Sequence, residues 1–254
     1  MKTYIAFTKK EIYELAKTYK LLLIIIVFLI LGFMNPITAK FTPDLLEACM
    51  EEGTKIELPE PTIIDSWVQF FKNVSQMGLV ILVIMFSGII SNELTKGTLI
   101  NMLTKGLSRK TVVLSKFTST CLIWTMAYFL AAAVTFLYSM LFWEDTEVAN
   151  LLFSVSLVWI FGIFLISAVI LGGILFNSSY GAMLFCGLIV AFLLFLNMLP
   201  SIKEYNPVQL VVVNMDLLKE NIEVSDLLKC IWINIGASVL FLVSSIVVFC
   251  KREF

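Results

Sequence analysis

Long apolar runs without any acidic or basic residue alternate with polar segments along this chain of 254 residues. A bilayer core about 30 Å thick is crossed by roughly 20 apolar residues in a helix, and a charge near its centre is costly. The pattern therefore predicts an all-α integral membrane protein, a single transmembrane domain with six transmembrane helices. These helices are expected near residues 21–39, 74–91, 118–143, 151–176, 182–199 and 230–250.

The connecting segments differ in charge when they are sorted alternately. One set holds 12 of the 18 Lys and Arg and 4 of the 19 Asp and Glu, and consists of residues 1–20, 92–117, 177–181 and 251–254. The other holds 6 basic and 15 acidic residues, and consists of residues 36–73, 144–150 and 200–229. Since Lys and Arg are retained on the cytoplasmic side during insertion, the first set and both termini are predicted to be cytoplasmic.

Composition excludes much catalytic chemistry. The chain has no histidine, its five cysteines are scattered, and it contains no GxxxxGK[ST] phosphate-binding loop. Imidazole-based metal sites and His-dependent nucleophiles are excluded, and the paired carboxylates lie in predicted outer loops. We therefore expect no catalytic residue, no metal site and no cofactor bound by this chain. The predicted spans also lack the charged residues of a proton or sodium relay, which argues against secondary transport.

The N-terminal segment, residues 1–20, predicts an amphipathic helix. Its apolar face comprises Tyr4, Ile5, Ile12, Leu15, Ala16 and Tyr19, and its polar face Lys2, Lys9, Lys10, Glu14, Lys17 and Lys20. Such a helix lies in the cytoplasmic headgroup layer, where its lysines meet anionic lipid. An ordinary positive flank without a defined helix is the alternative.

The first predicted outer loop, residues 36–73, contains two helix patterns. Thr42-Pro43-Asp44 is typical of a helix start and predicts a short helix to about Met50. Residues 65–73 place Trp67, Phe70 and Phe71 on one face, which predicts an interfacial helix leading into the second span. All six prolines fall in outer loops or at their edges, so none is expected to interrupt a span.

The segment from residue 91 to 117 is long for a connection. Gly97 and Gly106 predict the limits of a short helix, whose apolar face is formed by Leu99, Ile100, Met102 and Leu103. Ser108 can cap a further helix that leads into the third span. A short helix with one apolar face is typical of a docking element for another protein, although it could also rest on lipid.

This segment resembles the corresponding part of ABC-2 family permeases, on the residues Glu93, Gly97, Thr98, Leu103, Ser108, Arg109 and Lys116. The resemblance implies an elbow helix at 4–19, a coupling helix near 97–104 and a short re-entrant pair of helices within 200–229. It also implies a bacterial cell membrane location and a separate cytoplasmic ABC ATPase subunit, which carries ATP and Mg. The residues implied in coupling are Glu93, Lys96, Gly97, Thr98, Leu99, Met102, Leu103, Ser108 and Arg109.

Six helices form a thin wall, so a second permease copy or a paralogue is expected to complete the path. Candidate path residues are Phe86 and Ser87 on the second span and Phe192, Phe195, Asn197 and Met198 on the fifth. The function expected is the membrane subunit of an ATP-driven exporter of an amphipathic peptide or other hydrophobic compound. The alternative is a membrane immunity or sensor protein that binds such peptides without transport. Membrane lipid is an expected contact, and nucleic acid is not.

Overall fold

The computed structural model describes residues 2–48, 60–144 and 147–252, without the side chains of residues 45–48. Among these residues it contains helices and no strand, and six helical segments are long and apolar enough to cross a membrane. The prediction of an all-α membrane protein with six spans is confirmed. The six segments are Lys20–Asp44, Ile63–Thr95, Arg109–Phe142, Leu151–Phe176, Ser179–Leu196 and Val224–Lys251.

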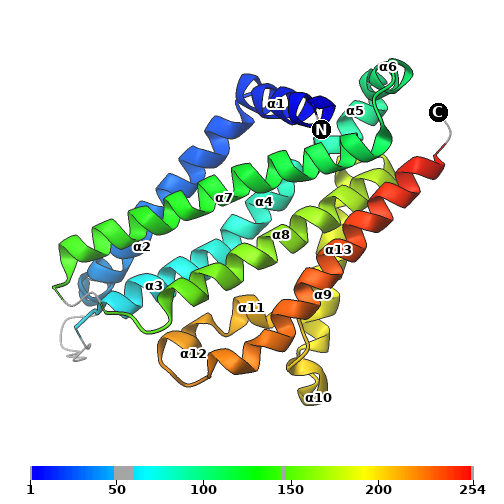
Figure 1. The fold of residues 1–254 in the computed structure, drawn as a ribbon. Helices are drawn as coiled ribbons and strands as arrows, with labels where there is room; N and C mark the ends of the chain where they lie inside the picture. Colours follow the sequence, from blue (N-terminus) through cyan, green and yellow to red (C-terminus); the bar gives the residue numbers. More distant parts are fainter. Residues whose placement is uncertain (1, 49–59, 145–146, 253–254) are drawn as a thin grey trace.

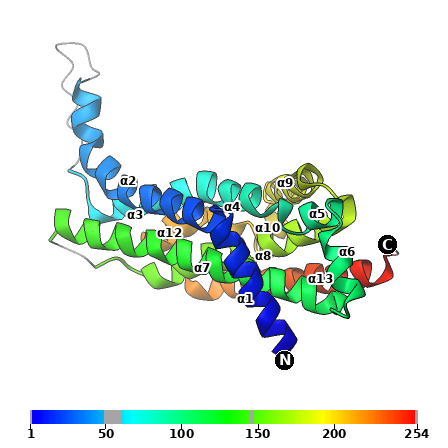
Figure 2. The ribbon, with the colours of Figure 1, turned by 90° about the horizontal axis from the view of Figure 1, so that it is seen from above.

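The long helices run side by side as an elongated bundle, and the N- and C-termini lie at the same end of it (Figure 1). That end, which we call the terminal end, also carries α6 (Thr98–Thr104) and the helix α1 (Lys2–Lys17). Figure 2 shows α1 crossing over α7 (Arg109–Phe142) rather than continuing the direction of α2 (Lys20–Ala48). The predicted N-terminal helix is therefore present, and it lies across the bundle.

The central helix is α8 (Leu151–Phe176), which is apolar all round and buried along most of its length. It packs against α9 (Ser179–Leu196), α13 (Leu228–Lys251) and α7. Gly162 allows the indole of Trp124 to approach, because a Cβ atom there would lie 2.4 Å from the ring. Trp124 Nε1 donates to the carbonyl of Trp159, and Trp159 Nε1 donates to Thr125 Oγ1. Trp124 and Trp159 are thus packing residues.

The second span begins earlier than the charge-free run suggested. It starts with α3 (Ile63–Asn73) and continues through a π-helical turn (Val74–Gly78), α4 (Leu79–Phe86) and α5 (Gly88–Thr95). The aromatic face of α3 is buried in the bundle: Trp67, Phe70 and Phe71 are each at most 2% exposed, and Phe70 packs on the ring of Tyr128. These rings therefore find aromatic partners inside the bundle, and the position of residues 65–73 at the outer interface stays a prediction.

The expectation that no proline interrupts a span, and that a new helix starts at Thr42, is wrong. Helix α2 runs through Pro36 and Pro43 to Ala48; Met50 lies outside the described residues. Pro36 has no N–H, so it leaves the carbonyl of Gly32 without its helical partner. Thr135 Oγ1 of α7 donates to that carbonyl at 3.0 Å, and Thr135 also accepts from Asn35 Nδ2. A neighbouring helix therefore replaces the hydrogen bond that proline removes.

The segment between α9 and α13 contains short helices: α10 (Pro200–Lys203), α11 (Gln209–Val212), α12 (Asn214–Leu218) and a 3-10 turn (Val224–Leu227). Helices α11 and α12 pack against α8, and α12 also packs against α3. Asn206 donates to the carbonyl of Leu193, and Gln209 bonds the side chain of Asn197. The short helices expected in this region are therefore present and are fastened to the end of α9.

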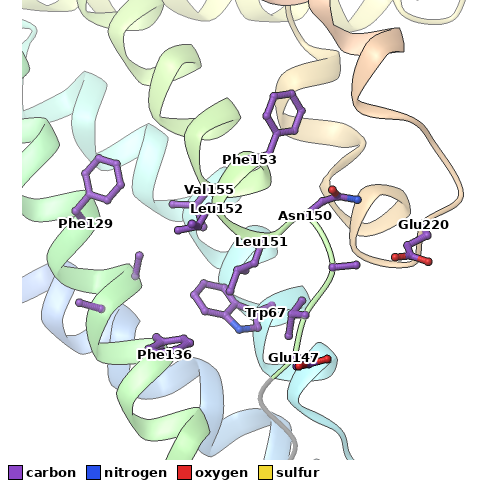
Figure 3. Close-up of a pocket in the computed structure, with 14 residues that line it drawn as sticks. Trp67, Phe129, Phe136, Glu147, Asn150, Leu151, Leu152, Phe153, Val155 and Glu220 are labelled. Atoms are coloured by element: carbon purple, nitrogen blue, oxygen red, sulfur yellow. The ribbon is translucent and has the colours of Figure 1, made fainter.

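An open groove of about 1120 Å³ lies at the end opposite the termini, which we call the distal end (Figure 3). Helices α3 and α7, the start of α8 and the segment before it, and the turn after α12 all contribute side chains. The groove is mostly apolar, with Glu147, Asn150 and Glu220 as its charged or amide side chains.

Candidate functional site

Helix α6 is the most prominent short element of the terminal end, and two glycines set its limits. Gly97 (φ +69°) precedes it and Gly106 (φ +93°) follows it, both in the left-handed region that other residues rarely adopt. The N–H of Gly106 bonds the carbonyl of Leu103, and the N–H of Leu107 bonds that of Met102, which closes the last turn. These glycines reverse the chain between α5 and α7 and leave α6 standing out from the bundle (Figure 1).

The apolar side of α6 faces its own chain. Leu99 is fully buried, and Met102 and Leu103 are half-buried against the core. Leu99 therefore supports the turn and is inaccessible to a partner. The surface that α6 leaves open is polar and consists of Thr98, Asn101, Thr104 and Lys105.

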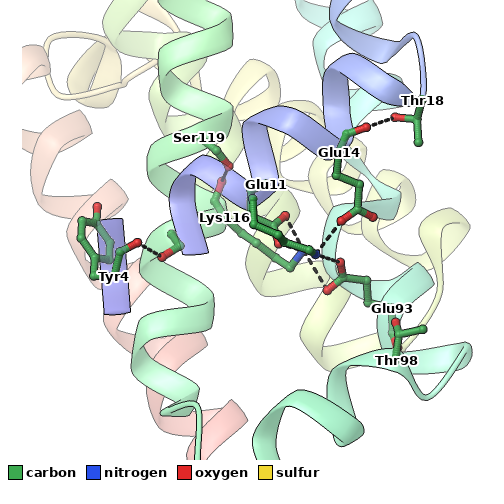
Figure 4. Close-up of polar contacts among 10 residues, drawn as sticks. Tyr4, Glu11, Glu14, Thr18, Glu93, Thr98, Lys116 and Ser119 are labelled. Atoms are coloured by element: carbon green, nitrogen blue, oxygen red, sulfur yellow. Dashed lines mark hydrogen bonds and ion pairs between the residues drawn. The ribbon is translucent and has the colours of Figure 1, made fainter. Parts of the chain in front are cut away.

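A cluster of charges lies beside α6, where α1, α5 and α7 meet (Figure 4). Lys116 Nζ of α7 is 2.8 Å from Glu11 Oε2 of α1 and 2.9 Å from Glu93 Oε2 of α5. The side chains of Lys116 and Glu11 are 1% and 3% exposed, and that of Glu93 is 13% exposed. Charges this deeply buried are tolerated only when they are paired, so the cluster fixes the three helices relative to one another.

Lys10 adds a second cation to this cluster. Its Nζ lies 3.1 Å from Glu11, 3.3 Å from Glu93 and 2.5 Å from Glu14. Burial lowers the pKa of Lys10, but the hydrogen bond to Glu14 and the charges of Glu11 and Glu93 outweigh it and raise the pKa above its ordinary value. For Glu14, burial acts to raise the pKa. The hydrogen bond and the charge of Lys10 outweigh burial, so the pKa of Glu14 lies below its ordinary value.

Carboxylate oxygens of Glu11, Glu14 and Glu93 lie within 4.8 Å of one another, a spacing that could suit a metal ion. The ammonium groups of Lys10 and Lys116 already contact these carboxylates. The cluster is therefore satisfied as a set of ion pairs.

Polar contacts continue from the charge cluster around the terminal end. Arg109 Nη1, at the start of α7, donates to the carbonyls of Phe249 and Cys250 at the end of α13, at 3.0 and 2.8 Å. Arg252, just beyond α13, donates to the carbonyl of Ile174 and to Asn177 Oδ1, at 2.8 and 2.6 Å. Each arginine thus satisfies carbonyls at a helix C-terminus, where a cation is favoured.

The connection between α8 and α9 also contacts α5. Ser179 Oγ lies 3.0 Å from Asn92 Oδ1 and 3.2 Å from Ser91 Oγ, both on α5. Residue Asn177 of the same turn accepts from Arg252. Lys116 of α7 contacts α5 and α1, Arg109 of α7 contacts the end of α13, and Arg252 contacts the end of α8. Ser179, at the start of α9, leads back to α5. We call this closed set the polar ring.

The residues predicted for coupling divide into two groups. Glu93 and Arg109 belong to the polar ring, and Ser108 caps α7 through a hydrogen bond from the N–H of Thr111. Lys96 and Thr98 are exposed, Gly97 forms the turn, and Leu99, Met102 and Leu103 pack inward. The structure thus brings these residues to one end of the molecule, but most of them hold α6 in place and few are open to a partner.

The predicted path residues are not gathered on one surface of this chain. Phe86 and Ser87 are buried inside the bundle, at 2% and 4% exposure. Phe192 and Phe195 are exposed on α9; of the two residues just beyond it, Met198 is exposed and Asn197 is half-buried.

Sequence reasoning gave no individual role to Glu11, Asn92, Ser179 or Arg252. Glu11 could have been noticed as an acidic residue within a basic segment, close to the expected membrane surface. Its partner Lys116 is 105 positions away, so the pairing itself was not visible.

Comparison with known proteins identifies the family. The model of the ABC-2 family transporter protein matches residues 5–248. The chain belongs to the ABC-2 transporter family. It is also similar to an uncharacterized transmembrane protein, YxlG, of Bacillus subtilis (strain 168), with 24% identity over 190 residues, which cover 74% of this chain and 73% of the relative.

Membership in the ABC-2 family makes this chain a multi-pass membrane protein and a permease subunit of an ABC transporter. Such a permease is the transport component, and it normally works with an ATPase subunit. The six spans and the transmembrane relative agree with location in a bacterial plasma membrane.

Proposed function

We propose that this permease is half of the membrane path of an ATP-driven exporter whose separate ATPase subunit docks at the terminal end. A second copy or a paralogue completes the path, and the ATPase binds ATP and Mg. The terminal end then lies in the cytoplasm. The charge distribution supports this orientation, because most Lys and Arg outside the spans fall in the segments that lead to that end.

The main support for the proposal is the position of α6, which lies beside the polar ring. A coupling helix must transmit a displacement to the spans without deforming relative to them. Helix α6 is joined directly to α5 and α7, and Glu93 and Lys116 pair across those two helices at 2.9 Å. A push on α6 would therefore move the ends of the spans together, as rigid-body rocking of packed helices requires.

The cargo proposed is an amphipathic peptide or another hydrophobic compound. Among the described residues, the charged groups that are buried belong to the terminal-end cluster. The middle of the bundle offers apolar and small polar side chains instead. Such an interior suits a cargo that carries much apolar surface.

The test is reconstitution with a P-loop ATPase encoded beside this permease. The permease alone should hydrolyse no ATP, and the pair should co-purify and hydrolyse it. Asn101→Arg and Lys105→Glu change exposed side chains of α6 and should reduce recovery of the complex without reducing membrane insertion. Ser201→Arg, an exposed position of α10 at the distal end, is the matched control and should have no effect.

Undiminished co-purification of both α6 variants would refute docking on this surface. Leu103→Asp is a less specific variant, because Leu103 packs against its own chain and its loss would also disturb the turn.

A further inference from the structure

The surface around α6 carries positive charge that the chain itself does not pair. Lys96 precedes α6, Lys105 follows it and Lys110 lies in the first turn of α7, and all three side chains are exposed. None of the three forms an ion pair with a described residue. The other two cations of this segment are engaged: Arg109 bonds the end of α13, and Lys116 pairs with glutamates.

The same surface offers no unpaired carboxylate to balance these lysines. Residues 85–121 are all described and contain one acidic residue, Glu93. Its carboxylate oxygens lie 2.9 Å from Lys116 and 3.3 Å from Lys10, and its side chain is 13% exposed. The exposed charge around α6 is therefore of one sign, and the complementary surface is acidic.

The exposed side of α6 differs from that of a helix that rests on lipid. Helix α1 exposes Ile5 and Tyr13 beside its lysines, at 49% and 63%, as a helix in the headgroup layer does. Between Ile84 and Leu122, by contrast, no large apolar side chain is exposed. The lysines around α6 thus adjoin polar side chains, which favours contact with a protein in water over contact with the membrane.

We propose that α6 docks into an acidic cleft of the ATPase, where Asp or Glu side chains pair with Lys96, Lys105 and Lys110. This rests on the proposed function and deepens it, because it names the chemistry of the partner's surface. Lys96 and Lys105 lie at opposite ends of a helix of seven residues, which is about 10 Å long. The carboxylates that meet them therefore come from two separate places in the cleft.

Pairing of this kind makes the association depend on salt. Charges across an interface steer the partners together and fix their orientation, and dissolved ions screen exposed pairs. The docking surface of α6 has no exposed apolar side chain to anchor the complex when these pairs are screened. The complex is therefore expected to weaken as the salt concentration rises.

The first measurement is cross-linking with a carbodiimide, which joins an amine to a carboxylate where the two are in contact. The permease in nanodiscs of phosphatidylcholine alone is mixed with the P-loop ATPase encoded beside it, and the cross-linked peptides are identified by mass spectrometry. Lys96, Lys105 and Lys110 should be joined to Asp or Glu of the ATPase. Three exposed lysines of α1 are the internal control and should not be joined to it: Lys2, Lys9 and Lys17.

The second measurement is the dissociation constant of the same complex. The triple variant Lys96→Gln/Lys105→Gln/Lys110→Gln should weaken binding about tenfold at low salt, as the loss of three exposed pairs implies, and should converge with the parent at high salt. Replacement of the same three lysines by arginine should retain binding. The matched control removes the same charge from α1, by Lys2→Gln/Lys9→Gln/Lys17→Gln, and should bind as the parent does.

Equal affinity of the parent and the α6 triple variant, or an affinity that does not fall with salt, would overturn the acidic cleft. So would an equal loss in the α1 control, which is a general effect of net charge, and so would a requirement for phosphatidylglycerol, which assigns the lysines to anionic lipid. Binding that is lost in Asn101→Arg but kept in the α6 triple variant would leave docking on α6 intact without the acidic cleft. Failure of the parent to bind the ATPase at any salt concentration would instead refute the proposed function, and this inference with it.

Discussion

The two ends of this bundle are held together in different ways. At the terminal end, buried charges, arginine side chains and Ser179 join α1, α5, α7, α8, α9 and α13 through the polar ring. At the distal end, α3, α7, the start of α8 and two connecting segments border an open groove, and the ion pair Lys229–Glu204 is 57% and 71% exposed. The terminal end is therefore joined by buried polar contacts, whereas the distal end contains an open groove.

This difference fits the proposed docking of an ATPase at the terminal end, where a displacement of α6 has to reach several spans together. A buried ion pair is not an efficient way to stabilise a fold, because desolvation offsets much of the attraction. It does fix the relative positions of the helices that contribute its members. The polar ring is therefore better understood as a set of contacts that fixes the relative positions of the span ends.

The largest expected effect comes from Lys116→Met. It leaves the buried carboxylate of Glu11 and the nearly buried one of Glu93 with only Lys10 to pair with, and breaking a buried pair costs about 3–5 kcal/mol. The measurement is the thermal midpoint of the purified permease by fluorescence-detected size exclusion. Lys229→Met is the control at the distal end and should leave the midpoint unchanged, since its pair is exposed. Equal shifts for both lysines would contradict the contrast between the ends.

A smaller loss of stability is expected for Arg109→Met. It removes the donor to the carbonyls of Phe249 and Cys250, and a hydrogen bond to a charged group is worth about 1.5–3 kcal/mol. Lys110→Met, the adjacent exposed residue, should be neutral. Hydrogen exchange should show the gain in exchange concentrated in the last turn of α13, and protection retained there would argue against the cap.

Thr135→Val tests the replacement of the hydrogen bond that Pro36 removes. The carbonyl of Gly32 loses its donor, at a cost of about 1–3 kcal/mol. Pro36→Ala restores the helical N–H, so the same threonine substitution should cost less in that background. A double-mutant cycle on thermal midpoints measures the difference, and additive effects would show that Thr135 does not compensate for the proline.

The smallest effect concerns Glu14. Its lowered pKa means that it stabilises the fold above its ordinary value of 4.5, and that this contribution disappears as the pH falls through the folded-state pKa. Thermal midpoints of the parent and Glu14→Gln should differ slightly at pH 7 and converge in acid. A difference that grew as the pH fell would contradict the pairing with Lys10.

The sequence predicted what depends on local pattern. Apolar length located the six spans, and Gly97 and Gly106 located α6, because positive φ angles need glycine there. What it did not predict depends on contacts between distant residues. Pro36 is accepted because Thr135 lies beside it, and α3 is buried because its rings meet Tyr128. Likewise, the polar ring joins residues from six helices that lie far apart in the sequence, so its pairings could not be predicted.

The most direct test of the account is the side of the membrane on which each end lies. On a background without the five cysteines, Asn101→Cys reports on α6 and Ser201→Cys on α10. In intact cells, a membrane-impermeant maleimide should label Ser201→Cys at once and Asn101→Cys only after permeabilisation. Labelling of Asn101→Cys from outside would place α6 away from cytoplasmic ATP and contradict the docking of an ATPase at the terminal end.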